Sequence, residues 1–515
     1  MIPSLVLLDR VTNSDAIVHG VSAFGFGIGL VGNRNLGDDR SMSSSAGQVR
    51  IPVELEAEMT PRVRAFVATL LAEIDRLKEE VADLKKRLPK TPQNSSTPSG
   101  SQHPHAKPKR RKRKGGRKRG GQPGHAKHAR PLRLTDECDD VVPLKPPKCR
   151  RCGVGLEGDD PDPLRHQIFE LPVIQPHVTE YQRHRLTCSC CGQTTCAELP
   201  PDVPTGQSGP RLIAFTALLM AFFRQSKRRT ALFLESLLGQ PCCPALTVKH
   251  QKLATDALRP AYDEIVGQLP TQTRLGIDES PTKQASEKAW LWTFVAGTFT
   301  LFAIRTSRAA VILGELLTEN FRGIVNCDRA KMYWSLERLQ WCWAHLKRDF
   351  QALIDYPDAQ VKRLGHDLMR QTKILFREWS RCRDGTITRK TMKRRLKPVR
   401  DEVESLLLRG RCSGNPRLVG MCRELYDHRQ WLWNFLDHEN VEPTNNGSER
   451  SLRHAVIWRK LSFGTQSAAG SRFVETMLTV IDTCRKQSRD VFAYVTAAIQ
   501  ASFENQPPPS LLSDP

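Results

Sequence analysis

The sequence lacks any apolar run long enough to span a lipid bilayer. The apolar stretches at residues 18–31 and 212–223 fall short of the roughly 20 residues that a transmembrane helix needs. It also lacks the basic start of a secretory leader, because Asp9 stands beside Arg10 before the first of these stretches. The sequence therefore predicts no membrane segment.

Acidic residues are fewer than basic ones, and the cysteines do not follow a disulfide pattern. The 515 residues include 78 lysines and arginines against 55 aspartates and glutamates, a net charge of +23, which indicates a polyanionic partner. The 15 cysteines are odd in number and scattered, which favours a reducing compartment over a disulfide framework. With 39% apolar residues, a chain of this length can build about three domains.

The N-terminal part contains one periodic segment. Residues 1–58 show little pattern, and we interpret them as a disordered extension, or as sequence upstream of a later start such as Met42 or Met59. Residues 59–88 predict a coiled-coil helix, and hence a homo-oligomer, because apolar residues recur at alternating steps of three and four. The alternative is one amphipathic helix that packs on its own domain. The seam consists of Val67, Leu70, Ile74, Leu77, Val81, Leu84 and Leu88.

Residues 89–131 predict a basic disordered linker. Twelve lysines and arginines and no acidic residue lie between Lys107 and Arg130. Such an arm would bind DNA phosphates without reading sequence; the alternative is a solvated tail that aids solubility. The densest cluster consists of Lys109, Arg110, Arg111, Lys112, Arg113 and Lys114.

Residues 132–205 contain two Cys-x-x-Cys-Gly turns and predict a DNA-binding zinc ribbon. Cys149 and Cys152 form the first pair, and Cys188 and Cys191 form the second. Two such turns suit a closed tetrahedral thiolate site, so the zinc would be structural and not catalytic. Cys190 could compete with Cys191.

Residues 206–270 predict a helical region, in which a helix-turn-helix and plain helical packing are both open. From residue 271 the pattern predicts a strand at 273–280 with Asp278 near its end, a hairpin at 290–305, a helix at 309–319 and a strand at 323–328 that ends in Asp328. If the first and fourth strands are neighbours, the two carboxylates emerge side by side.

A third carboxylate, Glu449, lies in the first turn of a helix predicted to begin at Asn445 or Asn446. Three converging carboxylates favour magnesium or manganese, and two such ions about 4 Å apart can drive phosphodiester displacement. The alternatives are a turn aspartate at Asp278, a helix N-cap at Asp328, and a capping box in which Asn446 caps and Glu449 bonds back, with Arg453 as its partner one turn on.

Several motifs occur along the chain in a specific order. They are Gln93-Asn94-Ser95-Ser96, Gly120-Gly121-Gln122-Pro123-Gly124-His125, Ile277-Asp278-Glu279-Ser280, Cys327-Asp328, Cys342-Trp343-Ala344-His345-Leu346-Lys347-Arg348 and Asn445-Asn446-Gly447-Ser448-Glu449-Arg450. In these motifs the chain resembles, from about Val63 to Ala501, the DDE transposases of bacterial insertion-sequence family sixty-six. It departs from the family in the first fifty residues, in Cys190, and in a Ser-Pro at Ser280 where Thr-Pro is more usual.

The resemblance implies a ribonuclease-H-like core with Asp278, Asp328 and Glu449 as the catalytic triad. It also implies cleavage at the terminal inverted repeats of an insertion sequence, strand transfer into target DNA, small companion proteins of the same element, and a cytoplasmic, nucleoid-associated bacterial protein. The alternative is a catalytically inactive DNA-binding protein with a zinc ribbon and a coiled coil.

Residues 271–500 would form the catalytic domain, with a helical insertion at about 335–440, and residues 501–515 a disordered tail.

Six tryptophans of the insertion region could stack on bases or form its core. His345 could lie at the active site or be structural. Arg450, Arg453 and Lys460 are candidate DNA contacts, although the two arginines could form surface ion pairs instead. The sequence thus predicts a multidomain α/β protein: a ribonuclease-H-like core with a helical insertion, preceded by a coiled-coil helix, a basic linker and a zinc ribbon.

Overall fold

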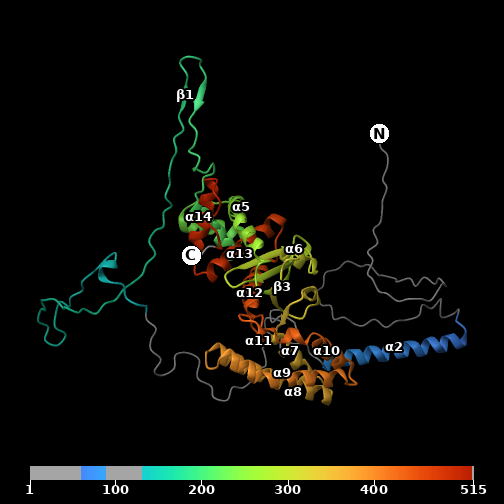
Figure 1. Cartoon of the computed structure of the whole chain (residues 1–515). Helices are drawn as coiled ribbons and strands as arrows, with labels where there is room; N and C mark the ends of the chain where they lie inside the picture. Colours follow the sequence, from blue (N-terminus) through green and yellow to red (C-terminus); the bar gives the residue numbers. More distant parts are fainter. Residues whose placement is uncertain (1–58, 88–129, 513–515) are drawn as a thin grey trace, which may run out of the picture. The chain divides into compact units, whose positions relative to one another are not determined.

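The computed structural model describes residues 59–87 and 130–512 (Figure 1). The predicted extension at 1–58 and the linker cluster from Lys109 to Lys114 lie outside the described residues. The chain divides into two compact units, residues 1–87 and residues 88–515, and each is described by itself below. None of the helices among the described residues is long and apolar enough to cross a membrane.

The described part of the first unit is one helix, α2 (Pro61–Arg87). Three residues of its predicted seam are exposed: the relative exposure is 47% for Leu70, 41% for Ile74 and 47% for Leu77. The helix itself is confirmed. Because the described part of this unit offers these side chains no apolar surface of its own, pairing with a second chain stays a prediction that the exposure favours.

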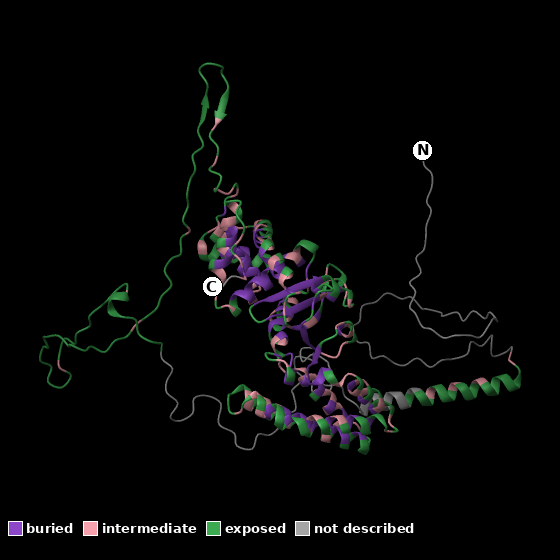
Figure 2. Cartoon of the chain, in the orientation of Figure 1, coloured by how far each residue is buried: buried purple, intermediate pink, exposed green. Residues whose placement is uncertain are grey.

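Residues 130–209 have little regular structure. They contain a short 3-10 helix, η2 (Thr135–Glu137), and a hairpin of β1 (Arg185–Thr187) with β2 (Thr194–Cys196). Figure 2 shows that nearly all of this segment is exposed, apolar side chains included. A segment that buries so little apolar surface gains little folding energy from packing, and its stabilisation by zinc stays a prediction.

A helical layer follows. It consists of α3 (Pro210–Ala221), α4 (Lys227–Leu238) and α5 (Pro244–Gln268), joined late in the chain by α13 (Ala468–Lys486) and α14 (Val491–Phe503). α3 is apolar on most of its surface because α5 and α14 both pack against it. α4 begins where Ser226 accepts the N–H of Arg229 and ends at Gly239, whose φ of 61° suits glycine.

The sheet has five strands in the order β5-β4-β3-β6-β7. β3, β4 and β5 form antiparallel pairs, whereas β6 pairs in parallel with both β3 and β7. The predicted strands, the hairpin and the helix before β6 are confirmed, and one strand, β7, was not predicted. The elements are β3 (Arg274–Gln284), β4 (Glu287–Val295), β5 (Thr300–Arg305), α6 (Val311–Leu317), β6 (Ile324–Cys327) and β7 (Leu339–Trp341).

Helices fill the chain between β7 and Glu449. They are α7 (Trp343–Ile354), α8 (Ala359–Arg383), α9 (Arg389–Arg411), α10 (Pro416–Asp427) and α11 (Asn434–Asp437), with the short 3-10 turn η4 (Arg429–Leu432); a second 3-10 turn, η3 (Lys331–Ser335), precedes β7. The exposure of Trp341, Trp343 and Trp433 is 1% or less, and Trp431 is also buried. For these tryptophans the base-stacking hypothesis is wrong, and they form core.

α13 covers the edge strand β5. Three of its side chains, at successive helical turns, accept backbone N–H groups of β5: Glu475 from Ile304 at 2.9 Å, Thr479 from Phe302 at 2.9 Å and Thr483 from Thr300 at 3.2 Å. Glu475 is fully buried and is neutralised by Arg259 and Arg472. The helix therefore satisfies donors that an edge strand normally leaves to solvent.

The C-terminal segment corrects one prediction. Residues 501–512, expected to be a disordered tail, pack on α5 and α14. Leu511 is fully buried, its N–H and the hydroxyl of Ser510 donate to Glu264, and the hydroxyl of Tyr494 donates to the carbonyl of Pro509. A polar, proline-rich composition predicts disorder only when no partner surface exists, and here α5 supplies one.

Candidate active site

Asp278 and Asp328 lie at the same level of two neighbouring strands. Gly276 pairs with Asn326 in the parallel ladder of β3 and β6, and each aspartate follows two residues later, Asp328 directly after the end of β6. Side chains two residues apart point to the same face of a sheet, so both carboxylates lie on one face at one level. Asp328 is not an N-cap: it accepts the N–H of Ala330 at 2.8 Å in a turn before η3.

Helix α12 (Asn446–Ser462) brings the third carboxylate to this face. It packs against β3 and β4 (Figure 1), and its first turn lies over Gly276, where a Cβ atom would overlap the hydroxyl of Ser448. Asn445 donates to the carbonyl of Ile277 at 2.7 Å and accepts from Ser448 at 2.7 Å. Only a glycine on β3 allows the helix this approach.

The same contacts overturn the capping-box alternative. The N-cap residue is Asn445 and not Asn446, and its side chain caps no helix N–H because it is used in the contact with β3. Glu449 forms an ion pair with His345 and Arg348 instead of bonding back, so tertiary contacts override the local pattern.

The loop before α12 is fixed on the parallel strands. The buried amide of Asn326 donates to the carbonyl of Glu442 at 2.6 Å, and the N–H of Asn445 donates to the sulfur of Cys342 at 3.1 Å. Asn326 lies on β6 and Cys342 directly follows β7. The position of Glu449 is therefore set by the same strands that position Asp328.

The acidic side chains in this region affect one another's pKa values. Burial, followed by the charges of Glu279, Asp328 and Glu449, raises the pKa of Asp278 well above its usual value. Burial and the Asp328 charge also raise the pKa of Glu279, although Arg308 donates to Glu279 at 2.8 Å and Tyr333 donates to its other oxygen. Like charges this close require a compensating cation or a shared proton.

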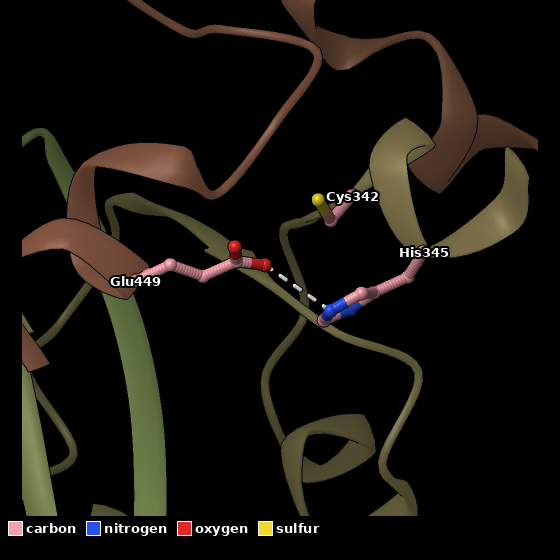
Figure 3. A group of neighbouring side chains, drawn as sticks. All are labelled: Cys342, His345 and Glu449. Atoms are coloured by element: carbon pink, nitrogen blue, oxygen red, sulfur yellow. Dashed lines mark ion pairs between the residues drawn. The ribbon is translucent and has the colours of Figure 1, made fainter. Parts of the chain in front are cut away.

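Glu449 is held by the motif around His345 (Figure 3). Nε2 of His345 lies 3.2 Å from Oε1 of Glu449, and Arg348 lies 4.0 Å from the same oxygen. This buried oxygen has no hydrogen bond of good geometry within the described structure. His345 and Arg348, both on α7, therefore lie beside Glu449 without hydrogen-bonding to this oxygen.

The described residues contain one group of three possible metal ligands at this place. Cys342, His345 and Glu449 each place a ligand atom within 4.8 Å of the others (Figure 3). Burial raises the pKa of the Cys342 thiol to about 12, and a neutral thiol is a poor ligand. The carboxylates predicted from the sequence, Asp278, Asp328 and Glu449, do not form such a group in the described structure, so their joint binding of a hard cation stays a prediction.

Three residues of the acidic neighbourhood were not singled out from the sequence: Glu279, Arg308 and Tyr333. The signal for Glu279 was its position directly after Asp278. Arg308 and Tyr333 belong to segments whose contacts with β3 arise only in the folded sheet.

The candidate DNA contacts on α12 are exposed. Arg450, Arg453 and Lys460 all lie at the surface of this helix. Among the described residues Arg450 and Arg453 form no ion pair, so the surface-pair alternative lacks support there. Their role in DNA binding stays a prediction.

Each of the two Cys-x-x-Cys-Gly turns is formed, but the two turns do not meet. The N–H of Gly153 donates to the carbonyl of Cys149 and that of Gly192 to the carbonyl of Cys188, both at 2.9 Å, and both glycines have positive φ. N–H groups of the second cysteine of each turn, and then of the residue before it, lower the pKa of Cys149 and of Cys188. Each turn thus favours a thiolate, as zinc requires. The structure does not gather the four predicted ligands, which also include Cys152 and Cys191, into one group.

A mixed five-stranded sheet covered by helices, with aspartates at one level of adjacent parallel strands, defines a mixed α/β domain. The family model described as "Transposase IS66 family" matches residues 205–472, more than half of the chain. The chain belongs to this family of transposases, which are enzymes that process nucleic acid, and the resemblance found in the sequence is confirmed.

Other comparisons extend the match. Residues 47–131 match a family of unknown function, DUF6444. Two uncharacterized proteins of Sinorhizobium fredii (strain NBRC 101917 / NGR234) are similar. Protein y4qI is 24% identical over 259 residues, 44% of this chain and 46% of y4qI, so the chain spans about half the length of that relative. Protein y4hP is 26% identical over 414 residues, 72% of this chain and 73% of y4hP.

Proposed function

We propose that the chain binds the terminal inverted repeats of an insertion sequence and catalyses metal-dependent DNA cleavage and strand transfer into target DNA. The observation that supports this proposal is the position of Asp278 and Asp328 at one level of adjacent parallel strands, with Glu449 near enough to raise the pKa of Asp278. Membership of a transposase family and a net charge of +23 agree with DNA as the partner.

Asp278, Asp328 and Glu449 would hold magnesium or manganese through carboxylate oxygens. When bound, such ions activate the attacking hydroxyl and stabilise the leaving oxygen of an in-line phosphodiester displacement. The protein's own part is positional. β3 and β6 fix the two aspartates, Gly276 admits α12, and His345 with Arg348 orients Glu449.

The core would be ribonuclease-H-like, a proposal supported by the strand order and by the parallel pairing of β3 with β6. A zinc ribbon would bind DNA beside it, and the seam of α2 would join copies of the chain. The protein would act at the nucleoid, and companion proteins of the same element would be its partners. The competing hypothesis, an inactive DNA-binding protein, would not need acidic residues at all three positions, and so it is less well supported.

The test is cleavage of a labelled duplex containing the element's end, in magnesium or manganese, by the full-length protein. Asp278→Asn, Asp328→Asn and Glu449→Gln should each abolish cleavage while leaving end binding largely intact, because each removes a metal ligand and no DNA contact. Asp401→Asn, an exposed aspartate on α9, is the matched control and should cleave normally. A ligand variant with wild-type cleavage would remove that residue from the site.

A further inference from the structure

A basic hollow lies at the far end of α12 from Glu449. It encloses about 590 Å³ and is lined by residues of β3, β4 and the end of α12, with no acidic side chain among them. Its cations are Lys283, Lys288, Arg459 and Lys460, and its aromatic residue is Phe463. Of these, Lys460 was a candidate DNA contact from the sequence, and the other four were not.

The hollow lies further along α12 and β3 than the candidate active site. α12 runs beside β3 in the same direction: Ser448 lies over Gly276, and Arg459 donates to the carbonyl of Pro281. Pro281 is three residues beyond Asp278, or about 10 Å along a strand. Because phosphates of one strand of a duplex are about 3.4 Å apart along its axis, the hollow begins about three nucleotides from the aspartates.

Phe463 is an exposed aromatic residue with a left-handed backbone conformation. It is 83% exposed and has a φ of 59°, a conformation that bulky residues rarely adopt and in which a helix end normally has glycine. The next residues are fixed to the hairpin of β3 and β4. The N–H of Thr465 donates to the carbonyl of Lys283 at 2.9 Å, and the N–H of Ala285 donates to the carbonyl of Thr465 at 2.7 Å. An exposed ring is therefore held on a rigid support.

The cations are also placed by contacts. Lys288 lies over the ring of Trp290, 5.0 Å from its centroid, and Arg459 is held by the carbonyl of Pro281. Lys283 is exposed and lies directly opposite Lys288 in the register of β3 and β4, two residues beyond Pro281. A group of cations beside an exposed aromatic ring is the combination that binds single-stranded nucleic acid, with phosphates on the cations and a base on the ring.

We propose that this hollow binds a DNA strand with an unpaired base next to the cleavage site. Lys283 and Lys288 bind its phosphates, and Phe463 stacks on the base. The proposal rests on the proposed function, since it takes the active site as the place where DNA is cleaved. A strained backbone at an exposed aromatic residue is explained by this role, because the strain serves to present the ring.

The test compares two fluorescent probes bound by the full-length protein: a blunt duplex, and the same duplex with a short run of unpaired thymidines at one end. Phe463→Ala should weaken binding of the forked probe about tenfold and leave the blunt probe nearly unchanged. Lys283→Ala with Lys288→Ala should weaken both, and should reduce the salt slope on the unpaired strand by about 0.7 for each phosphate that the variant no longer binds. Equal affinity of wild type and Phe463→Ala for the forked probe would overturn the proposal.

Controls separate this role from folding and from the proposed function. Phe463→Gly should raise the melting temperature, because glycine relieves the positive φ, yet it should bind the forked probe as poorly as Phe463→Ala. Phe223→Ala removes another exposed ring, and Lys390→Ala with Lys397→Ala removes two exposed lysines of α9; both should bind like wild type. These readouts need no cleavage. If the wild-type protein cleaves no DNA in any assay, the proposed function is refuted. If Phe463→Ala binds the forked probe like wild type, the proposed role of the hollow is refuted.

Discussion

Gly276 of β3 lies directly under Ser448 of α12. A Cβ atom on Gly276 would overlap the hydroxyl of Ser448 and would lie 2.9 Å from the side-chain oxygen of Asn445. The helix that begins there carries Glu449 one residue later, so the absence of one methyl group on a strand sets the distance between a helix and two aspartates.

Gly276→Ala should move the start of α12 away from the sheet. We expect a loss of about 1–3 kcal/mol of stability from overpacking, and a fall in cleavage of about a hundredfold if the carboxylate moves by about 1 Å. Gly314→Ala, in α6 with open space around it, should be neutral or slightly stabilising. Unchanged cleavage in Gly276→Ala would show that the approach of α12 is not critical.

Asp278→Asn should stabilise the metal-free protein. Because the pKa of Asp278 is raised, the folded state binds a proton more tightly than the unfolded chain, and ionisation above the ordinary value of 3.8 costs stability. The neutral amide removes that cost. Thermal unfolding in a chelator should therefore show a higher melting temperature for the variant than for wild type, and added magnesium should narrow or reverse the difference.

His250 should make the protein sensitive to acid. Its two ring nitrogens lie 2.8 Å from the hydroxyl of Ser208 and 3.1 Å from that of Thr216, and burial, with the charge of Lys249, lowers its pKa from 6.5 to about 4. The unfolded chain then binds the proton first, so stability is complete above pH 6.5 and is lost as the pH falls toward 4, by up to about 3 kcal/mol.

Chemical denaturation across this pH range measures the effect. His250→Gln should lose most of the dependence on pH, whereas His366→Gln, at an exposed histidine of α8, should keep it. A wild-type stability that is flat between pH 6.5 and 4 would contradict the buried neutral histidine.

The cysteine turns should bind zinc jointly. We expect purified protein to contain about one zinc ion per chain, and Cys149→Ser or Cys188→Ser to release it and unfold residues 132–205, because metal binding supplies most of the folding energy of such a module. Elemental analysis and limited proteolysis measure the two effects. Cys190→Ser and Cys412→Ser are the controls, and a Cys190 variant that loses its zinc would change the ligand set.

The sequence predicted the sheet around the aspartates because its strands are regular. Three antiparallel strands, a helix and a further strand leave few ways to place the last strand, and a parallel position beside the first puts Asp278 and Asp328 together. β7 was missed because three residues with a glutamine at their centre give no periodic signal. Gln340 is tolerated because its amide donates to the carbonyls of Trp341 and Leu432, and the second residue is 92 positions away.

The surroundings of Glu449 could not be predicted, because they too depend on residues that are distant in the sequence. Local preference favours a capping box at Asn446. In the structure the N-cap is Asn445, and its side-chain amide donates to the carbonyl of Ile277, 168 positions earlier. The ordered C-terminal segment depends likewise on Glu264, 246 positions before Ser510. Contacts between such distant residues exist only once the sheet and helices have assembled.

The side chains of α13 on β5 decide how copies of this protein can meet. An edge strand with free N–H groups can recruit a strand from another molecule and extend the sheet from chain to chain. On β5 the donors of Thr300, Phe302 and Ile304 already bond to Thr483, Thr479 and Glu475. This edge is closed to strand exchange and to fibril growth, so copies of the chain that associate must do so through other surfaces.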